Sequence, residues 1–225
     1  EFNTKFNPGS RFGGDYFDIF EHEDKLKFGI LISSASGYGL SSVLLAVIIK
    51  ISSQIEARRG LPPHQVLKTL AEEVIPQIKN QDHASLFYAV VDRRNFEMEY
   101  SSVGKIIGYH QVSGQERLEE LKGSIRPLGA GFVDDIVSHK VQLNPRDRFI
   151  LVTEGVAESQ TADGKTWGED GLISAIRTAP KLGVHELRNE ILYMNELATG
   201  KKTPLRDQTI IVGEVKDRVI KLARK

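Results

Sequence analysis

The sequence predicts an α+β fold in a single domain that covers residues 1–225. Strands occur in hairpins, because the apolar run 86–91 and the alternating segment 96–100 are joined by the polar turn 92–95. Helical segments, recognised by apolar residues at three- and four-residue spacing, are grouped between the strands. No repeat, low-complexity tract or linker divides the chain. Hairpin strands with separate groups of helices are typical of layered α+β domains.

The first third of the chain is predicted to form two strands and then two helices. A strand runs from residue 15 to a turn at residues 22–24, and residues 25–32 alternate polar and apolar side chains, as a half-buried strand does. A helix follows and is expected to end near residues 59–60, where basic residues precede a glycine. Its apolar face consists of Leu40, Val43, Leu44, Val47, Ile48, Ile51 and Ile55. A second helix is expected over residues 62–76, with a proline at each end.

The rest of the chain is predicted to return to strands and then to helices. Further strands are expected at residues 105–112, 136–143, 149–153 and 209–215, and helices at residues 169–178 and 184–198. The glycine-rich segment 122–131 is expected to be irregular, and the charged tail 216–225 to form a short helix.

Composition excludes several classes of protein. The formal net charge is zero and the pI is about 7.3, so no overall field attracts nucleic acid or an anionic membrane. No apolar run approaches the roughly 20 residues that span a bilayer. The absence of cysteine excludes disulfides, thiolate metal sites and a cysteine nucleophile. The six histidines lack an i, i+4 pair, and both the serine-hydrolase G-x-S-x-G motif and the nucleotide phosphate loop are missing.

Two segments near the N-terminus carry the residues on which the chemistry depends. Residues 13–18 read GGDYFD, and residues 31–39 read LISSASGYG directly before the first helix. Carboxylates and Ser/Gly loops at strand ends are places where proteins hold metals or phosphates. A glycine-rich turn between two core elements explains these residues equally well when they are taken alone.

Three further motifs follow along the chain: NPRDRFILVTEGVAE at residues 144–158, DGKTWG at 163–168 and DQTIIV at 207–212. With these motifs in this order, the chain resembles the SpoIIE/RsbU branch of the PPM-type (protein phosphatase 2C-like) metal-dependent serine/threonine phosphatases over nearly its whole length. The resemblance implies a four-layer αββα sandwich, in which two antiparallel sheets pack face to face between helices. It also implies a cytoplasmic domain of bacterial signalling, excised from a longer chain with an upstream sensor or receiver domain.

The resemblance implies a metal centre, and mapping it onto this chain reveals departures from the family pattern. Family members place aspartates at four points around two Mg²⁺ or Mn²⁺ ions, which bind and acidify a water. Asp15 matches the first point, and Ser34 stands at the second, beside Ala35 at a position whose backbone carbonyl often helps to hold metal. Glu154 replaces the third aspartate and Arg206 falls on the fourth, so the formal charge of the four positions changes from −4 to −1.

An arginine at the fourth point opposes the binding of a cation. Two unit charges 4 Å apart interact by about 4 kcal/mol at an effective dielectric near 20, and arginine does not deprotonate. We therefore expect no metal, or weak Mn²⁺ or Mg²⁺, rather than a two-metal centre. Asp207 could replace Arg206 only if the strand slipped by one residue, which would turn it inside out unless a bulge absorbed the change. Asp18 and Glu158 either support the metal ligands without touching the metal or are structural, and Lys105 either meets a phosphate or is solvated.

Three functions remain open at this point. The first is a pseudophosphatase in which Arg206 pairs with Asp15 and Glu154 as their counter-charge. The second is a working phosphatase with one weak or displaced metal, held by Asp15, Glu154 and either Asp18 or Asp207. The third is an interaction module that does not depend on phosphate. By resemblance, the partner is a serine-phosphorylated STAS-type anti-anti-sigma factor in sigma-factor regulation, and a homodimer through the helix at residues 40–55 is possible.

Overall fold

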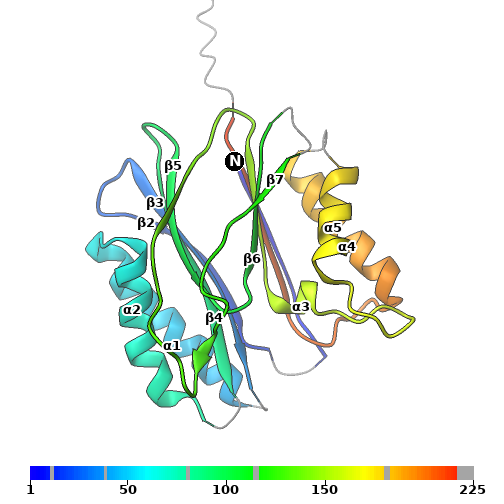
Figure 1. Ribbon diagram of the computed structural model, residues 1–225, viewed down its shortest axis with the longest axis horizontal. Coiled ribbons are helices and arrows are strands. Elements are labelled where there is room, and N and C mark those ends of the chain that lie inside the picture. Colours follow the sequence, from blue (N-terminus) through cyan, green and yellow to red (C-terminus); the bar gives the residue numbers. More distant parts are fainter. Residues whose placement is uncertain (11–12, 38–39, 80–81, 114–116, 180–182, 217–225) are drawn as a thin grey trace, which may run out of the picture.

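The computed structural model describes residues 1–10, 13–37, 40–79, 82–113, 117–179 and 183–216. Two antiparallel sheets pack face to face, with one pair of helices outside each sheet (Figure 1). The predicted α+β fold with αββα layers is thereby confirmed. The helix predicted at residues 216–225 lies almost entirely outside the described residues.

The two sheets are built from strands that are far apart in the sequence. The first sheet has the order β1–β11–β10–β6–β7, formed by β1 (Phe2–Asn7), β11 (Gln208–Glu214), β10 (Arg148–Val152), β6 (Ile107–Gln111) and β7 (Leu118–Glu120). The second has the order β2–β3–β4–β5–β9, with β8 paired to β4, formed by β2 (Asp15–Glu21), β3 (Lys27–Ser36), β4 (His83–Asp92), β5 (Glu97–Val103), β9 (His139–Gln142) and β8 (Leu128–Gly129).

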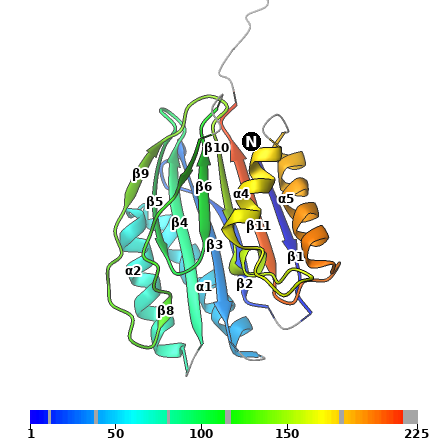
Figure 2. The ribbon, with the colours of Figure 1, turned by 45° about the vertical axis from the view of Figure 1, so that its right-hand side comes forward.

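The helices cover the outer faces of both sheets, as Figure 2 shows from a second direction. The second sheet is covered by α1 (Leu40–Glu56) and α2 (Pro63–Val74), which end in the short 3₁₀ turns η1 (Ala57–Arg59) and η2 (Ile75–Gln77). The first sheet is covered by α4 (Gly168–Thr178) and α5 (Val184–Thr199), while the single turn α3 (Glu154–Ala157) follows β10.

Strand β3 shows why the sequence forms these layers. Ile30 and Ile32 point into the core between the sheets, whereas Leu31 points into the core beneath α1 and α2. Successive side chains of a strand alternate between its faces, so a strand that is buried on both faces reads as a nearly continuous apolar run. All three side chains are fully buried.

Five elements differ from the sequence-based expectations. β1, β7, β8 and α3 were not expected, β8 lying within the segment 122–131 that was expected to be irregular, and β9 occupies only part of the predicted strand at residues 136–143. β1 obtains its partner from β11, about 200 residues later, so no local pattern marks it. Ile136, which precedes β9, is buried in the core cluster that includes the side chains of α2.

Helix α1 is more apolar than the sequence analysis allowed. Residues 40–59 are long and apolar enough to cross a membrane by length and composition alone, a test that core helices also pass. One side of α1 is packed, since Leu45 and Ile49 are buried on the second sheet. The opposite side carries an exposed stripe at three- and four-residue spacing: Leu40, Leu44, Val47, Ile51 and Ile55.

Candidate functional site

The candidate site forms where the ends of four strands meet. β2 begins at Asp15, directly opposite Ser34 of β3 in the antiparallel ladder. β10 leads through Thr153 into α3, and Thr209 lies near the start of β11. The backbone N–H of Thr153 donates to the carbonyl of Thr209, which joins these two strand ends. Four of the sequence motifs, those at residues 13–18, 31–39, 144–158 and 207–212, therefore come together where these strands end.

Two glycines allow the chain to approach this closely. A Cβ atom at Gly13 would overlap the carboxylate of Asp207, and one at Gly14 would overlap the carbonyl oxygen of Ala35. The backbone carbonyl of Ala35, which the resemblance assigns to metal binding, is therefore packed against Gly14 in this structure. Glycine is required at both positions because Gly13 lies against the side chain of Asp207 and Gly14 lies against the backbone of Ala35.

Asp15 is held by two threonines. Its Oδ2 accepts hydrogen bonds from Thr153 Oγ1 at 2.6 Å and from Thr209 Oγ1 at 2.8 Å. Burial raises the pKa of Asp15 to about 7, although hydrogen bonds from Thr153, Ser34 and Thr209 oppose the shift. The nearby charge of Asp207 raises the pKa further. At neutral pH this carboxyl group is consequently present in both protonation states.

Glu154 is ionised and enclosed by donors. Its side chain is 2% exposed, and its Oε1 accepts a hydrogen bond from Ser85 Oγ at 2.8 Å, with His83 Nε2 at 3.6 Å. Its Oε2 lies 3.1 Å from Nη1 of Arg206. Burial disfavours the charged form, but the hydrogen bonds from His83 and Ser85 and the charges of His83 and Arg206 outweigh it, so the pKa of Glu154 lies below its ordinary value.

Arg206 joins two glutamates rather than the expected pair. Its Nη1 contacts Glu154 and Glu158, each at 3.1 Å, and no contact with Asp15 is formed among the described residues. The expected Glu154 pairing is present, whereas Glu158 takes the place of Asp15. Lys105 Nζ lies 2.5 Å from the other oxygen of Glu158, and this hydrogen bond raises the lysine pKa. Glu158 is therefore part of the site, between two cations.

The remaining carboxylates lie close to the site or face away from it. Asp207 accepts hydrogen bonds from the backbone N–H of Gly9 at 2.8 Å and, more weakly, from that of Asp15 at 3.4 Å. The β11 ladder runs unbroken from residue 208 to 214, so no bulge is present in it to accommodate a one-residue slip. Asp18 lies on the opposite face of β2 from Asp15 and accepts a hydrogen bond from the hydroxyl of Tyr16 at 2.8 Å.

As arranged, these donors do not fit a two-metal centre. Both oxygens of Glu154 are engaged by the protein's own donors, and Oδ2 of Asp15 accepts two hydroxyls. Lys105, Arg206 and His83 surround the carboxylates with positive or potentially positive groups. Within the described ranges, no group of three or more His, Asp or Glu side chains is positioned to hold a metal ion.

The sequence analysis missed four residues of this site. Thr153 and Thr209 lie within the recognised motifs, and their hydroxyl groups could have been predicted to donate hydrogen bonds to a carboxylate of the site. His83 and Ser85 belong to β4 and reach the site because they pair with Ser36 and Ser34 of β3. Nothing in their local sequence indicates this placement.

Comparison with known proteins identifies the family. The model of the family described as stage II sporulation protein E (SpoIIE) matches residues 24–216, and the chain belongs to this family. The phosphoserine phosphatase RsbU of Bacillus subtilis (strain 168) is 26% identical over 157 residues, which cover 70% of this chain and 46% of that protein. The phosphoserine phosphatase RsbP of the same organism is 25% identical over 166 residues, covering 70% and 40%. The chain thus spans less than half the length of these relatives.

Solved structures share the fold. The SiaA-PP2C domain of Pseudomonas aeruginosa superimposes with a TM-score of 0.81 at 21% identity, covering 96% of this chain and 86% of that one. The phosphatase domain of SpoIIE from Bacillus subtilis gives a TM-score of 0.65 at 16% identity, covering 100% and 96%. The chain is therefore a SpoIIE/RsbU-like domain with the fold of PPM-type phosphatases.

Proposed function

We propose that this domain is a pseudophosphatase, which retains the phosphatase fold and uses it to bind a protein partner or to relay a signal. The observation that carries the proposal is the position of Arg206 between Glu154 and Glu158. A guanidinium supplies the positive charge that a metal ion would otherwise bring to buried carboxylates.

Titration calorimetry with Mn²⁺ tests the loss of the metal centre. We expect no saturable binding of two ions in the micromolar range, because Arg206 repels a cation and both oxygens of Glu154 are already engaged. We also expect no Mn²⁺-dependent release of phosphate from a phosphoserine protein. Micromolar binding of two ions per chain would contradict the proposal, and phosphate release that is lost in Asp15→Asn would support a working phosphatase instead.

The partner that we propose is a STAS-type protein regulated by serine phosphorylation. RsbU and RsbP support this class of partner, since both are named phosphoserine phosphatases, and a solved relative of the same fold is described as containing RsbU and RsbW domains. Lys105 and Arg206, together with His83 when it is protonated, provide positive charge at the site. Affinity should differ at least about tenfold between phosphorylated and unphosphorylated partner. Equal affinity would favour the phosphate-independent interaction module.

We further propose that the exposed apolar stripe of α1 is a homodimer interface. Its five side chains are between 45% and 66% exposed, and contiguous apolar surface of this kind marks interaction sites. Sedimentation equilibrium should show a dimer that dissociates in Leu44→Glu with Ile51→Glu. Val133→Glu, which also changes an exposed apolar residue, is the matched control. A parent chain that stays monomeric at high concentration would contradict this interface.

A further inference from the structure

Glu158 lies where two positively charged side chains converge. Lys105 Nζ is 2.5 Å from its Oε1, and Arg206 Nη1 is 3.1 Å from its Oε2. Each cation therefore contacts a different oxygen of the same carboxylate, which is how two cations hold a single anion. The side chains of these three residues are between 36% and 57% exposed, so an anion from outside the chain can reach the same position.

Glu154 contacts the same arginine but is not exchangeable in this way. Its side chain is 2% exposed, and Ser85 donates to the oxygen that Arg206 does not contact. If Glu158 moved away, Arg206 would keep its contact with Glu154 and would stay at the site. The backbone of Lys105 is also fixed there, since its N–H donates to Ser85 Oγ at 3.1 Å. The buried part of the site thus holds both cations, and Glu158 is the exposed anion between them.

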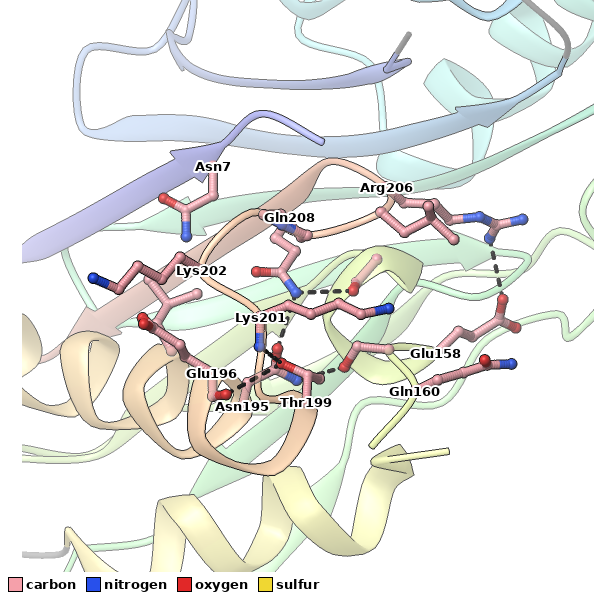
Figure 3. Close-up of a pocket in the computed structure, with 15 residues that line it drawn as sticks. Asn7, Glu158, Gln160, Asn195, Glu196, Thr199, Lys201, Lys202, Arg206 and Gln208 are labelled. Carbon is pink, nitrogen blue, oxygen red and sulfur yellow. Dashed lines mark hydrogen bonds and ion pairs between the residues drawn. The ribbon is translucent and has the colours of Figure 1, made fainter. Parts of the chain in front are cut away.

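A cavity beside the site gives the Glu158 side chain room to move. Its volume is about 360 Å³, and Glu158 and Arg206 both belong to its lining. Figure 3 shows these two side chains together at one side of the cavity, joined by the dashed line that marks their ion pair. Rotation of the Glu158 side chain into this space would free the position between Lys105 and Arg206 without any change in the backbone after α3.

We propose that Glu158 is an autoinhibitory occupant of the position between Lys105 and Arg206, and that the phosphoserine of the protein partner displaces it. This inference rests on the proposed function and adds how the site is regulated. A phosphoserine brings roughly two negative charges and three acceptor oxygens, against the single charge of Glu158. A carboxylate of the partner would only replace Glu158 by its equal, and the carboxylate that is tethered beside the cations has the higher effective concentration.

Glu158→Gln tests the proposal, because it removes the competing charge and keeps the shape of the side chain. Competition lowers the affinity of an incoming anion in proportion to the fraction of time for which the position is occupied. The variant should therefore bind N-acetyl-O-phosphoserine amide at least about tenfold more tightly than the parent does, in an NMR titration at about 0.15 M salt. Adding Lys105→Ala to this variant should abolish the gain, since one of the two cations is then missing.

Glu196→Gln is the matched control, because Glu196 also lines the cavity and its loss changes the net charge by the same amount. This control should bind the phosphoserine probe as the parent does. The inference is overturned if Glu196→Gln gains as much affinity as Glu158→Gln, or if N-acetylaspartate amide binds Glu158→Gln as tightly as the phosphoserine probe does. It is also overturned, with the proposed function intact, if Glu158→Gln gains nothing while both it and the parent prefer the phosphoserine probe to N-acetylserine amide. If neither protein distinguishes phosphoserine from serine, the proposed phosphate-dependent recognition fails together with the inference.

Discussion

Ser34→Asp combined with Arg206→Asp is expected to restore Mn²⁺ binding to this domain. The two changes return the formal charge of the four ligand positions from −1 to −4. Residue 34 lies directly opposite Asp15 in the β2–β3 ladder, so the new carboxylate would stand beside an existing one. Removal of the guanidinium also frees Oε2 of Glu154, which is the oxygen that Arg206 contacts.

The expected gain is large because two electrostatic terms change together. Each unit charge about 4 Å from a divalent ion contributes about 8 kcal/mol at an effective dielectric near 20, before desolvation is subtracted. We expect Mn²⁺ affinity at least about a hundredfold above that of the parent, measured by calorimetry. Ser34→Asn with Arg206→Asn is the control, since it removes the cation without adding carboxylates. If the aspartate pair gains no more Mn²⁺ affinity than this control, then restoring the ligand residues is not sufficient to restore the metal site.

Asp15→Asn is expected to stabilise the domain at alkaline pH. The folded state raises the pKa of Asp15 from 3.8 to about 7. Between these values the unfolded chain has released the proton while the folded chain retains it, so stability falls as the pH rises, and above about pH 7 the penalty is constant. Asparagine does not ionise, and its side-chain oxygen can still accept the hydroxyls of Thr153 and Thr209.

The pH dependence of this stabilisation is the measured quantity. Each pKa unit corresponds to about 1.4 kcal/mol, and because Asp15 is only half-buried the effect is discounted for solvent screening. The advantage of Asp15→Asn in unfolding free energy should therefore be about 2 kcal/mol larger at pH 8 than at pH 5. Urea denaturation at the two pH values measures it, with Asp18→Asn on the opposite face of β2 as the control. An advantage that is independent of pH would show that the folded state does not perturb the titration of Asp15.

Much of the fold could be predicted because its signals are local. The apolar runs of β4 and β10 and the helical spacing of α1, α2, α4 and α5 mark these elements within the sequence. β1 could not be predicted in this way, because it is stabilised by pairing with β11 at the far end of the chain. α3 could not be predicted, because a helix of four residues is too short to show apolar residues at helical spacing.

The sequence indicated which segments meet at the site, but not which side chains contact each other there. The resemblance of the motifs to those of PPM-type phosphatases implied that Asp15, Glu154 and Arg206 belong to one site. It did not indicate that Arg206 contacts Glu158 in place of Asp15, because side-chain direction depends on how α3 is oriented after β10. The presence of His83 at Glu154 follows from the β3–β4 register, which is a tertiary property.

A crystal structure of the unmodified domain grown with excess Mn²⁺ tests the central claim most directly. Our account predicts that the guanidinium of Arg206 stays within hydrogen-bond distance of Glu154 and Glu158, as it does here at 3.1 Å, with no ion between Asp15 and Glu154. Two manganese ions bridged by a water, with Arg206 turned away from both glutamates, would contradict it.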